Sequence, residues 1–382
     1  MALNQYLCGA MAYILQQVRT RSQFRKFINL PYRLYRGNPY YVPGLRSDEK
    51  AIFTKSPCLD YCKLRMWIVL DGKRAVGRIA GIINPRYNDL HDSARARFGW
   101  IEFEKDIEIA RMLLEAAEKW AAGEGMTEIT GPLGYNSWYK QGMLVYGFDH
   151  VPPVNCIYNF DYYPVFLEEL GYQKESDMIQ YRLSATQGAS DRLKRIAEVL
   201  MKRYPLRIAD VRELCKNDDM IDRFFEHYNQ TFRKVHNFIP LTDKEINVLG
   251  RQYVRMLRPE LNCFVLDDKD RIAAYGLCFP FMSEAFRKAR GRLFPFGWYH
   301  LLRGYSHYEG IDLMMVGADP AWQRKGVSAI YNVHLARQFN ERGIKFAITN
   351  PQNEHNPAIK VWEDYREKEL YMRRRCYIKS LR

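Results

Sequence analysis

One short stretch combines residue types and spacing that suit phosphate binding. Gln323, Gly326 and Ser328 form the pattern Gln-x-x-Gly-x-Ser, which opens a predicted helix after a predicted strand and the turn Asp319-Pro320. Backbone N–H groups in the first turn of a helix, together with the helix dipole, attract anions. A glycine lets a phosphate approach the backbone, and a small serine keeps the helix start uncrowded. The stretch predicts a phosphate-binding loop, with an ordinary strand-to-helix turn as the alternative.

The loop lies within an ordered series of predicted elements in the second half of the chain. A hairpin is predicted where strand-type residues flank the polar turn 267–270. A helix follows from apolar residues at helical spacing, with Gly343 as its stop. The series is strand 263–266, strand 271–279, strand 310–316, helix 326–341, strand 345–349, helix 358–365 and strand 373–379.

The first half repeats this order, beginning with a hairpin around Asp71-Gly72. Its series is strand 67–70, strand 75–83, strand 97–103, helix 107–122, strand 126–130, helix 162–170 and strand 176–183. The intervening segment 188–260 is predicted to be mainly helical, most strongly over 191–204 and 219–234. The repetition predicts an α/β fold with mixed α+β sheets, in two tandem domains of one type that cover 1–185 and 186–382.

With this context, the loop resembles the acyl-coenzyme A loop of the GNAT acyltransferase superfamily, Gln/Arg-x-x-Gly-x-Gly/Ala. Ser328 departs from the last position but keeps a small residue. The resemblance implies that the N–H groups of 324–328 hold a pyrophosphate and that the thioester lies where two strands part, facing Met315 to Gly317. Residues 345–350 are then the second wall. The implied donor-binding residues are Met315, Val316, Gly317, Gln323, Arg324, Lys325, Gly326, Val327, Ser328, Asn350, Asn353 and Asn356.

Acyl transfer from a thioester to an amine needs a base for the amine and a proton for the departing thiolate. The base candidates are Asp312, Glu309 and His307, although each carboxylate equally fits a solvated strand position. GNAT enzymes often use a tyrosine of the last helix as the acid, but alignment puts Trp362 at that position. The acid candidate is therefore Tyr365, and protonation by water is the alternative.

The first half lacks the phosphate-binding loop. Where the loop is expected, the chain reads Phe103-Glu-Lys-Asp-Ile-Glu-Ile109, with three carboxylates and no glycine. Carboxylates would repel a pyrophosphate. We expect the first domain either to form a wall of the acceptor site or only to support the second domain.

Longer segments sharpen the resemblance. Several stretches between residues 19 and 183, including GPLGYNSW, and the later segment GRLFPFGWYHLLR resemble a bacterial family of tandem-GNAT proteins that are N-acetyltransferases by name only. That family looks related to bacterial ceramide synthases, which move a fatty acyl group from a thioester to a long-chain amine. The resemblance implies an acyl-coenzyme A-dependent N-acyltransferase, with a sphingoid-type base as one acceptor and a small amine or peptide as another.

Composition sets limits on the partners. The chain has 382 residues, of which 47% are hydrophobic and 14% aromatic, which excludes a disordered chain. A net charge of +14 favours acidic partners such as a phosphorylated cofactor, an anionic membrane surface or nucleic acid. The eight cysteines show no CxxC pair, and the histidines are dispersed without HExxH, so no metal is expected.

Two further features concern location. The longest apolar stretch, 7–15, is too short to span a membrane, and its basic residues follow it, so we expect a cytoplasmic protein. The segment 280–308 interleaves basic and aromatic residues. Such a mixture suits contact with the inner face of the membrane, a groove for an acyl chain, RNA stacking, or simply a packed insertion.

Two other functions remain open from the sequence. Tandem GNAT domains with basic surfaces also occur in aminoacyl-tRNA-dependent transferases, although such a donor does not need a pyrophosphate loop. A non-catalytic protein that binds RNA or a small ligand is favoured if the acid and base candidates are structural. The sequence does not give an oligomeric state.

Overall fold

The computed structural model describes residues 5–8, 11–186, 188–215, 218–233, 235, 237–323, 325–356, 359 and 367–381. They form two compact units. Unit 1 contains Met1–Met178, Ser283–Leu301 and Met372–Arg382, and unit 2 contains Ile179–Met282 and Leu302–Tyr371. The sequence predicts two contiguous domains with a boundary at 185/186, whereas in the structure residues 283–301 and 372–382 belong to the first unit.

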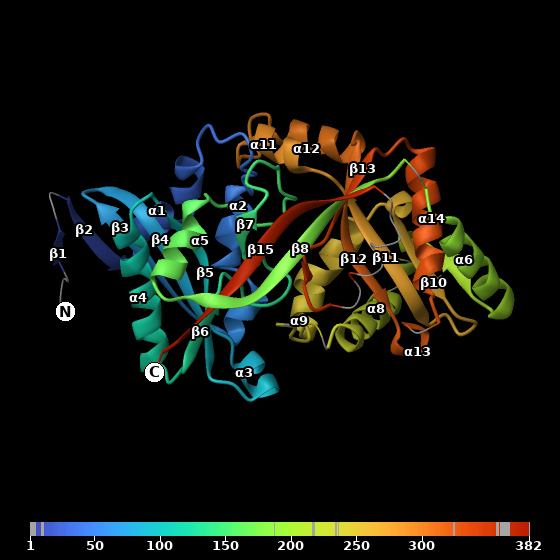
Figure 1. The fold of residues 1–382 in the computed structure, drawn as a ribbon, viewed down its shortest axis with the longest axis horizontal. Coiled ribbons are helices and arrows are strands. Elements are labelled where there is room, and N and C mark those ends of the chain that lie inside the picture. Colours follow the sequence, from blue (N-terminus) through green and yellow to red (C-terminus); the bar gives the residue numbers. More distant parts are fainter. Residues whose placement is uncertain are drawn as a thin grey trace. The chain divides into compact units, whose positions relative to one another are not determined.

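Unit 1 is built on a mixed sheet with the strand order β1-β2-β3-β4-β5-β6-β15, with β7 also paired to β15 (Figure 1). All neighbours are antiparallel except β5 and β6. The strands are β1 Gln5–Cys8, β2 Met11–Gln17, β3 Lys63–Asp71, β4 Arg74–Ile83, β5 Arg95–Phe103, β6 Glu128–Gly131, β7 Met143–Tyr146 and β15 Lys368–Ser380. The helices are α1 Arg21–Leu34, α2 Arg46–Ile52, a 3-10 turn Pro57–Asp60, α3 Pro85–His91, α4 Ile107–Gly123, α5 Tyr162–Glu169, α11 Ser283–Ala289 and the start of α12 Gly297–Ser306.

Helix α4 covers one face of this sheet and buries an apolar stripe that includes Ile109 and Trp120. Glycines on β4 allow the close approach, because a Cβ at Gly77 would lie 2.5 Å from Ile109 and one at Gly81 2.7 Å from Trp120. The predicted helix 107–122 and the hairpin around Asp71-Gly72 are confirmed. This packing fixes the direction in which the chain passes from β5 into α4.

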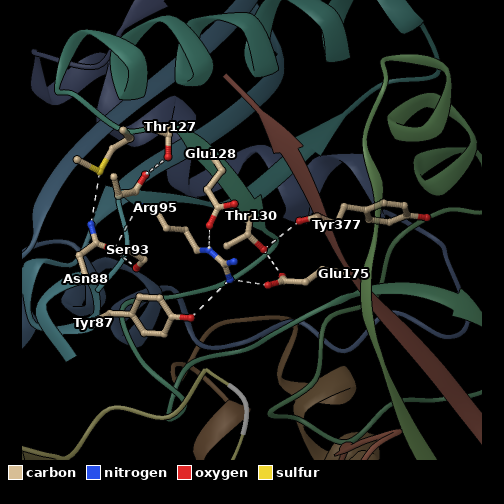
Figure 2. A network of polar contacts seen from close by, with 11 residues as sticks. Tyr87, Asn88, Ser93, Arg95, Thr127, Glu128, Thr130, Glu175 and Tyr377 are labelled. Carbon is tan, nitrogen blue, oxygen red and sulfur yellow. Dashed lines mark hydrogen bonds and ion pairs between the residues drawn. The ribbon is translucent and has the colours of Figure 1, made fainter. Parts of the chain in front are cut away.

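A polar network joins four strands of unit 1 (Figure 2). Arg95 on β5 donates to Glu128 on β6 at 2.6 Å and to Glu175 on β8 at 2.5 Å. The hydroxyl of Thr130 donates to Glu175 and, at 3.0 Å, to the backbone oxygen of Tyr377 on β15. The C-terminal part of β15 is therefore held in unit 1 by side chains as well as by its pairing with β6.

Unit 2 has the strand order β8-β13-β12-β11-β10-β9, with β14 paired to β8. Within it β12 and β13 are parallel, and the other adjacent pairs are antiparallel. The strands are β8 Gln173–Ser184, which begins in unit 1 because that unit extends to Met178, β9 Arg207–Ala209, β10 Asn262–Leu266, β11 Ile272–Pro280, β12 Gly310–Ala318, β13 Phe346–Thr349 and β14 Gln352–Asn353. The helical segments are α6 Asp191–Arg203, α7 Val211–Leu214, α8 Asp218–Thr231, α9 Asp243–Glu245, Ile246–Gly250, α10 Arg251–Arg255, Pro259–Leu261, α13 Pro320–Gln323 and α14 Ser328–Glu341.

The core of unit 2 lies between this sheet and the helix pair α14 and α6 (Figure 1). Buried residues of α14 such as Ile330 and Leu335 pack against β10 and β11. The predicted hairpin 263–279 and strands 310–316 and 345–349 are confirmed. The helix expected to begin at Gly326 begins at Ser328 instead, because Gly326 has a left-handed φ of 80°. Most of the predicted helix 358–365 lies outside the described residues.

None of the helices among the described residues is both long and apolar enough to cross a membrane.

Candidate active site

The predicted phosphate-binding loop connects β12 to α14 in unit 2. Asp319 organises its first turn, because its side chain accepts the N–H of Ala321 at 2.8 Å and its backbone oxygen accepts those of Trp322 and Gln323. The Gln323 side chain donates to the backbone oxygen of Ala318 at 3.0 Å. In this structure Gln323 therefore fixes the loop, with its amide turned to the chain itself.

The end of the loop leads into the first turn of helix α14. Ala329 and Ile330 donate back to the oxygens of Gly326 and Val327, at 3.0 Å each. The N–H groups of Gly326, Val327 and Ser328 precede these bonds, at the positions that helices leave without internal partners. Ile196 lies 3.3 Å from the place that a Cβ at Gly326 would occupy, so a side chain there is strained and crowded. Such a helix start can hold an anion.

The cationic side chain of Lys325 lies beside this helix start. The ammonium group of Lys325 is 4.3 Å from the ring centre of Trp322 and 5.1 Å from that of Tyr204. These aromatic contacts hold the charge next to the loop. Arg324 lies outside the described residues.

Strand β12 parts from its parallel neighbour just before the loop. The pairing with β13 covers four residue pairs and ends at Leu313 and Thr349. β12 also carries an extra residue, Met314, opposite β11. Beyond Leu313, the stretch that includes Met315, Val316 and Gly317 keeps its pairing with β11 and has left β13. The parting of strands that the sequence led us to expect is present at the predicted position.

The predicted second wall is only partly placed. Asn350 is exposed directly after β13. The Asn353 side chain accepts the N–H of His355 at 3.0 Å, and its backbone oxygen accepts that of Asn356 at 2.8 Å. The carboxamide of Asn353 thus stabilises a turn.

The three base candidates differ sharply in their surroundings. Asp312 is 6% exposed, and its Oδ1 atom has no hydrogen-bond partner among the described residues. Burial raises the pKa of Asp312 well above its usual range. Glu309 is exposed and forms an ion pair with Lys345 at 2.9 Å, while His307 is exposed before the strand. Of these three, Asp312 is the group with the properties of a buried base. Tyr365 lies outside the described residues.

Two buried residues near the loop were missed by sequence reasoning. The ring of Tyr275 on β11 lies against Gly317, since a Cβ there would be 2.6 Å from Cζ and 2.7 Å from the hydroxyl oxygen. Neither that hydroxyl nor Nε2 of His227, on α8, has a hydrogen-bond partner among the described residues. The Nε2 atom lies 3.9 Å from Asp319, and burial lowers the pKa of His227 although Asp319 opposes the change. Both residues are far from the loop in the sequence, so no sequence motif links them to it.

The corresponding turn of unit 1 is built differently. Asp106 caps α4 by accepting the N–H of Glu108 at 2.9 Å, and it also accepts the hydroxyl of Tyr13 at 2.8 Å. Glu104 forms ion pairs with Arg33 and Arg74, each at 2.8 Å. The helix start is therefore occupied by the chain's own carboxylate.

The described part of the chain contains no group of three or more His, Cys, Asp and Glu side chains that could hold a metal ion. No protein-family model matches the sequence.

Solved structures match this arrangement over nearly the whole chain. A tandem GNAT protein from the clavulanic acid biosynthesis pathway matches with a TM-score of 0.55 at 12% identity, covering 96% of this chain and 99% of that one. The chain has the tandem GNAT fold. A GCN5-related N-acetyltransferase from Sphaerobacter thermophilus matches with a TM-score of 0.53 at 10% identity, covering 96% of each chain. The predicted fold class is confirmed.

Two curated proteins are similar in sequence. Bacterial ceramide synthase of Caulobacter vibrioides is 27% identical over 289 residues, which are 75% of this chain and 74% of that protein. Protein YghO of Escherichia coli is 26% identical over 284 residues, 74% of this chain and 72% of that protein. These similarities agree with the family resemblance seen in the sequence.

Proposed function

We propose that this protein is an acyl-coenzyme A-dependent N-acyltransferase whose unit 2 binds the acyl donor. The observation that carries the proposal is the conjunction, in unit 2, of an open helix start after Gly326 with strands that part beyond Leu313. The N–H groups of 326–328 and the ammonium of Lys325 would hold the pyrophosphate. The thioester would lie along Met315 to Gly317.

In this proposal Asp312 takes a proton from the amine. A buried carboxyl group with a raised pKa is a stronger base than an ordinary one once it is ionised. The amine then attacks the thioester carbonyl, forming the amide C–N bond as the C–S bond breaks. The thiolate takes its proton from Tyr365, from the hydroxyl of Tyr275 or from water.

A thermal-shift series with coenzyme A and its acetyl, octanoyl and palmitoyl esters tests the donor site. A ligand that binds the folded state at one hundred times its Kd stabilises it by about 2.7 kcal/mol. We expect the shift to disappear in Gly326→Glu and to persist in the matched variant Gly343→Glu. Gly343 also has a left-handed φ, of 66°, and a Cβ there meets no atom within 4 Å. Absence of a shift with every ester would overturn the proposal and favour an RNA-binding or aminoacyl-tRNA-dependent protein.

The acceptor we propose is a long-chain amine met at an anionic membrane surface. The name of the similar Caulobacter protein supports a lipid amine. Around α12, large apolar side chains are exposed, led by Phe294 at 72% and Phe296 at 69%. The other exposed apolar residues are Leu293, Trp298, Tyr299 and Leu302, and the basic residues of the same segment are Arg287, Lys288, Arg290, Arg292 and Arg303. Aromatic and basic side chains together favour an anionic bilayer interface.

Cosedimentation with phosphatidylcholine vesicles, with and without phosphatidylglycerol, tests this contact. We expect binding to the anionic vesicles only, and its loss in the double variant Phe294→Ser/Phe296→Ser. The control Val165→Ser/Val199→Ser removes side chains that are 50% and 59% exposed elsewhere on the chain, and it should bind like the wild type. Equal binding of the two double variants would contradict the assignment of this surface.

A further inference from the structure

Unit 1 contains a pocket that has no part in the proposed donor site. The space among its lining residues, counted together with the solvent at its mouth, is about 750 Å³. It lies where β5 and β6 part, since their pairing ends at Arg97 and Thr130. Beyond β6 the chain approaches β5 again, with the N–H of Leu133 donating to the oxygen of Phe98 at 2.8 Å. The apolar lining includes Val42, Trp100, Ile101, Leu133, Met143 and Ile157.

Two of the charged residues in the lining, Glu102 and Arg78, are buried. Glu102 is 9% exposed, and its Oε2 atom accepts the hydroxyls of Tyr35 at 2.6 Å and Tyr163 at 3.0 Å. Its Oε1 atom accepts no hydrogen bond from a described residue and lies 3.8 Å from Nη2 of Arg78. Arg78 donates through Nη1 to the oxygen of Phe27 at 3.0 Å. The pocket therefore presents one free acceptor beside one donor, and buried polar atoms without partners cost stability.

Unpaired charges lie on the walls around these two residues. The side chain of Glu49 on α2 is half-buried and forms no hydrogen bond or ion pair with a described residue, and the same holds for the side chain of Lys140. Burial raises the pKa of Glu102, Arg78 opposes the change, and the charge of Glu49 adds to it. The positive charge of Arg78 already balances the carboxylate of Glu102. The carboxylate of Glu49 is therefore the negative charge that remains for a bound cation. The rings of Tyr32, Trp100 and Tyr158 lie in the same lining.

We propose that this pocket binds an amino alcohol that carries an apolar chain, the class of amine that the transfer reaction consumes. The ammonium group would donate to Oε1 of Glu102 and face Glu49, where aromatic rings also favour a cation. The neighbouring hydroxyl would accept from Arg78, and the chain would lie along the apolar walls. The choice of an amine rests on the proposed function. Lys140 is the group that an amino acid carboxylate would use, so a free amino acid is the competing ligand.

Isothermal titration calorimetry on the full chain, without any acyl donor, tests the pocket. The probe is 2-aminooctan-1-ol, compared with octan-1-ol and 2-aminooctanoic acid, which share its carbon chain. We expect saturable binding of one amino alcohol per chain. Octan-1-ol, which lacks the ammonium group, should bind at least about tenfold more weakly. The amino acid should also bind more weakly, because its carboxylate would lie near Glu102 and Glu49.

Three variants make the assignment specific. Glu102→Gln keeps the shape of the side chain and should weaken binding about tenfold or more. Glu49→Gln changes a half-exposed position without hydrogen bonds to lose, so it tests the pocket even if the first variant folds poorly, and it should weaken binding about threefold. Glu115→Gln, on the exposed face of α4, is the matched control and should bind like the wild type.

The outcomes separate this inference from the donor site. Amino alcohol binding that is absent in the wild type, unchanged in Glu49→Gln and Glu102→Gln, or weaker than amino acid binding would overturn it. Gly326→Glu should abolish the coenzyme A shift and leave amine binding intact. If no coenzyme A ester binds but the amino alcohol binds through Glu102, the pocket stands and the proposed transferase function fails.

Discussion

The carboxyl group of Asp312 allows a quantitative test of the candidate base. The group is buried on β12, its Oδ1 atom has no partner among the described residues, and burial alone raises its pKa well above the usual range. Asparagine has nearly the same shape and cannot ionise. Asp312→Asn should therefore remove the cost of burying a charge while leaving the packing almost unchanged.

The sign of the effect follows from proton linkage. Between the unfolded pKa, about 3.9, and the raised folded pKa, the folded state binds more protons than the unfolded state. The free energy of unfolding of the wild type therefore falls with rising pH in this window, by up to about 1.4 kcal/mol per pH unit. Protonated Asp312 carries no cost of burying a charge, so the wild type has its full stability below about pH 3.9. This stability is lost progressively as the pH rises from there to the folded pKa of Asp312. The variant lacks this loss, so its advantage should be larger at pH 6 than at pH 5, by up to about 1.4 kcal/mol.

Urea unfolding followed by tryptophan fluorescence measures this difference. With a typical slope of about 2 kcal/mol per molar urea, 1 kcal/mol moves the midpoint by about 0.5 M. The matched variant Glu309→Gln removes an exposed carboxylate that pairs with Lys345, and it should change stability by less than about 1 kcal/mol at both pH values. A stability difference between Asp312→Asn and the wild type that does not vary with pH would refute the reasoning. If Asp312 is the base, the Asp312→Asn variant should be more stable than the wild type and should transfer the acyl group more slowly.

Three further predictions concern unit 1. The pKa of Asp177 is shifted in the opposite direction to that of Asp312. Burial opposes the ionisation of Asp177, but hydrogen bonds and charge from Arg375 outweigh this effect and lower its pKa. Asp177→Asn should therefore destabilise the protein at pH 7, with the difference vanishing as the pH falls below about 4, as urea titrations at both pH values will show. Asp106→Ala removes the cap of α4 and should cost about 1 kcal/mol, measured as a lower melting temperature. Tyr163→Phe should cost about 1 to 3 kcal/mol in urea unfolding, because the N–H of Phe103 donates to its hydroxyl at 2.9 Å and loses that partner; an unchanged midpoint would show that water replaces it.

Local patterns predicted most of the secondary structure. The turn at Asp71-Gly72 and the apolar stripe of 107–122 act within a few residues of each other, so hairpin and helix can be recognised from the sequence. The assignment of 283–301 and 372–382 to unit 1 depends on contacts such as Tyr377 with Gly131, far apart in the chain. Neither periodicity nor turn residues carry that information.

The candidate site divides in the same way. The loop could be found because Gly326 and Ser328 lie in one short motif that needs a left-handed glycine. His227 and Tyr275 could not be found, because they reach the loop from α8 and β11 through packing. The buried position of Glu102 could not be predicted either. A glutamate within an apolar strand does not indicate which tyrosines will donate hydrogen bonds to it.

The pairing of β15 with β6 and β7 sets a condition on how unit 1 is made. Residues up to Met178 leave the ribosome long before the stretch that begins at Met372, which supplies the strand beside β6. At about 5 to 20 residues per second, the interval is on the order of ten seconds or more. During that time the edge of β6 is without its final neighbour, and an unpaired edge strand invites association with other chains. Nascent unit 1 is therefore a natural client for chaperones that shield such edges during synthesis.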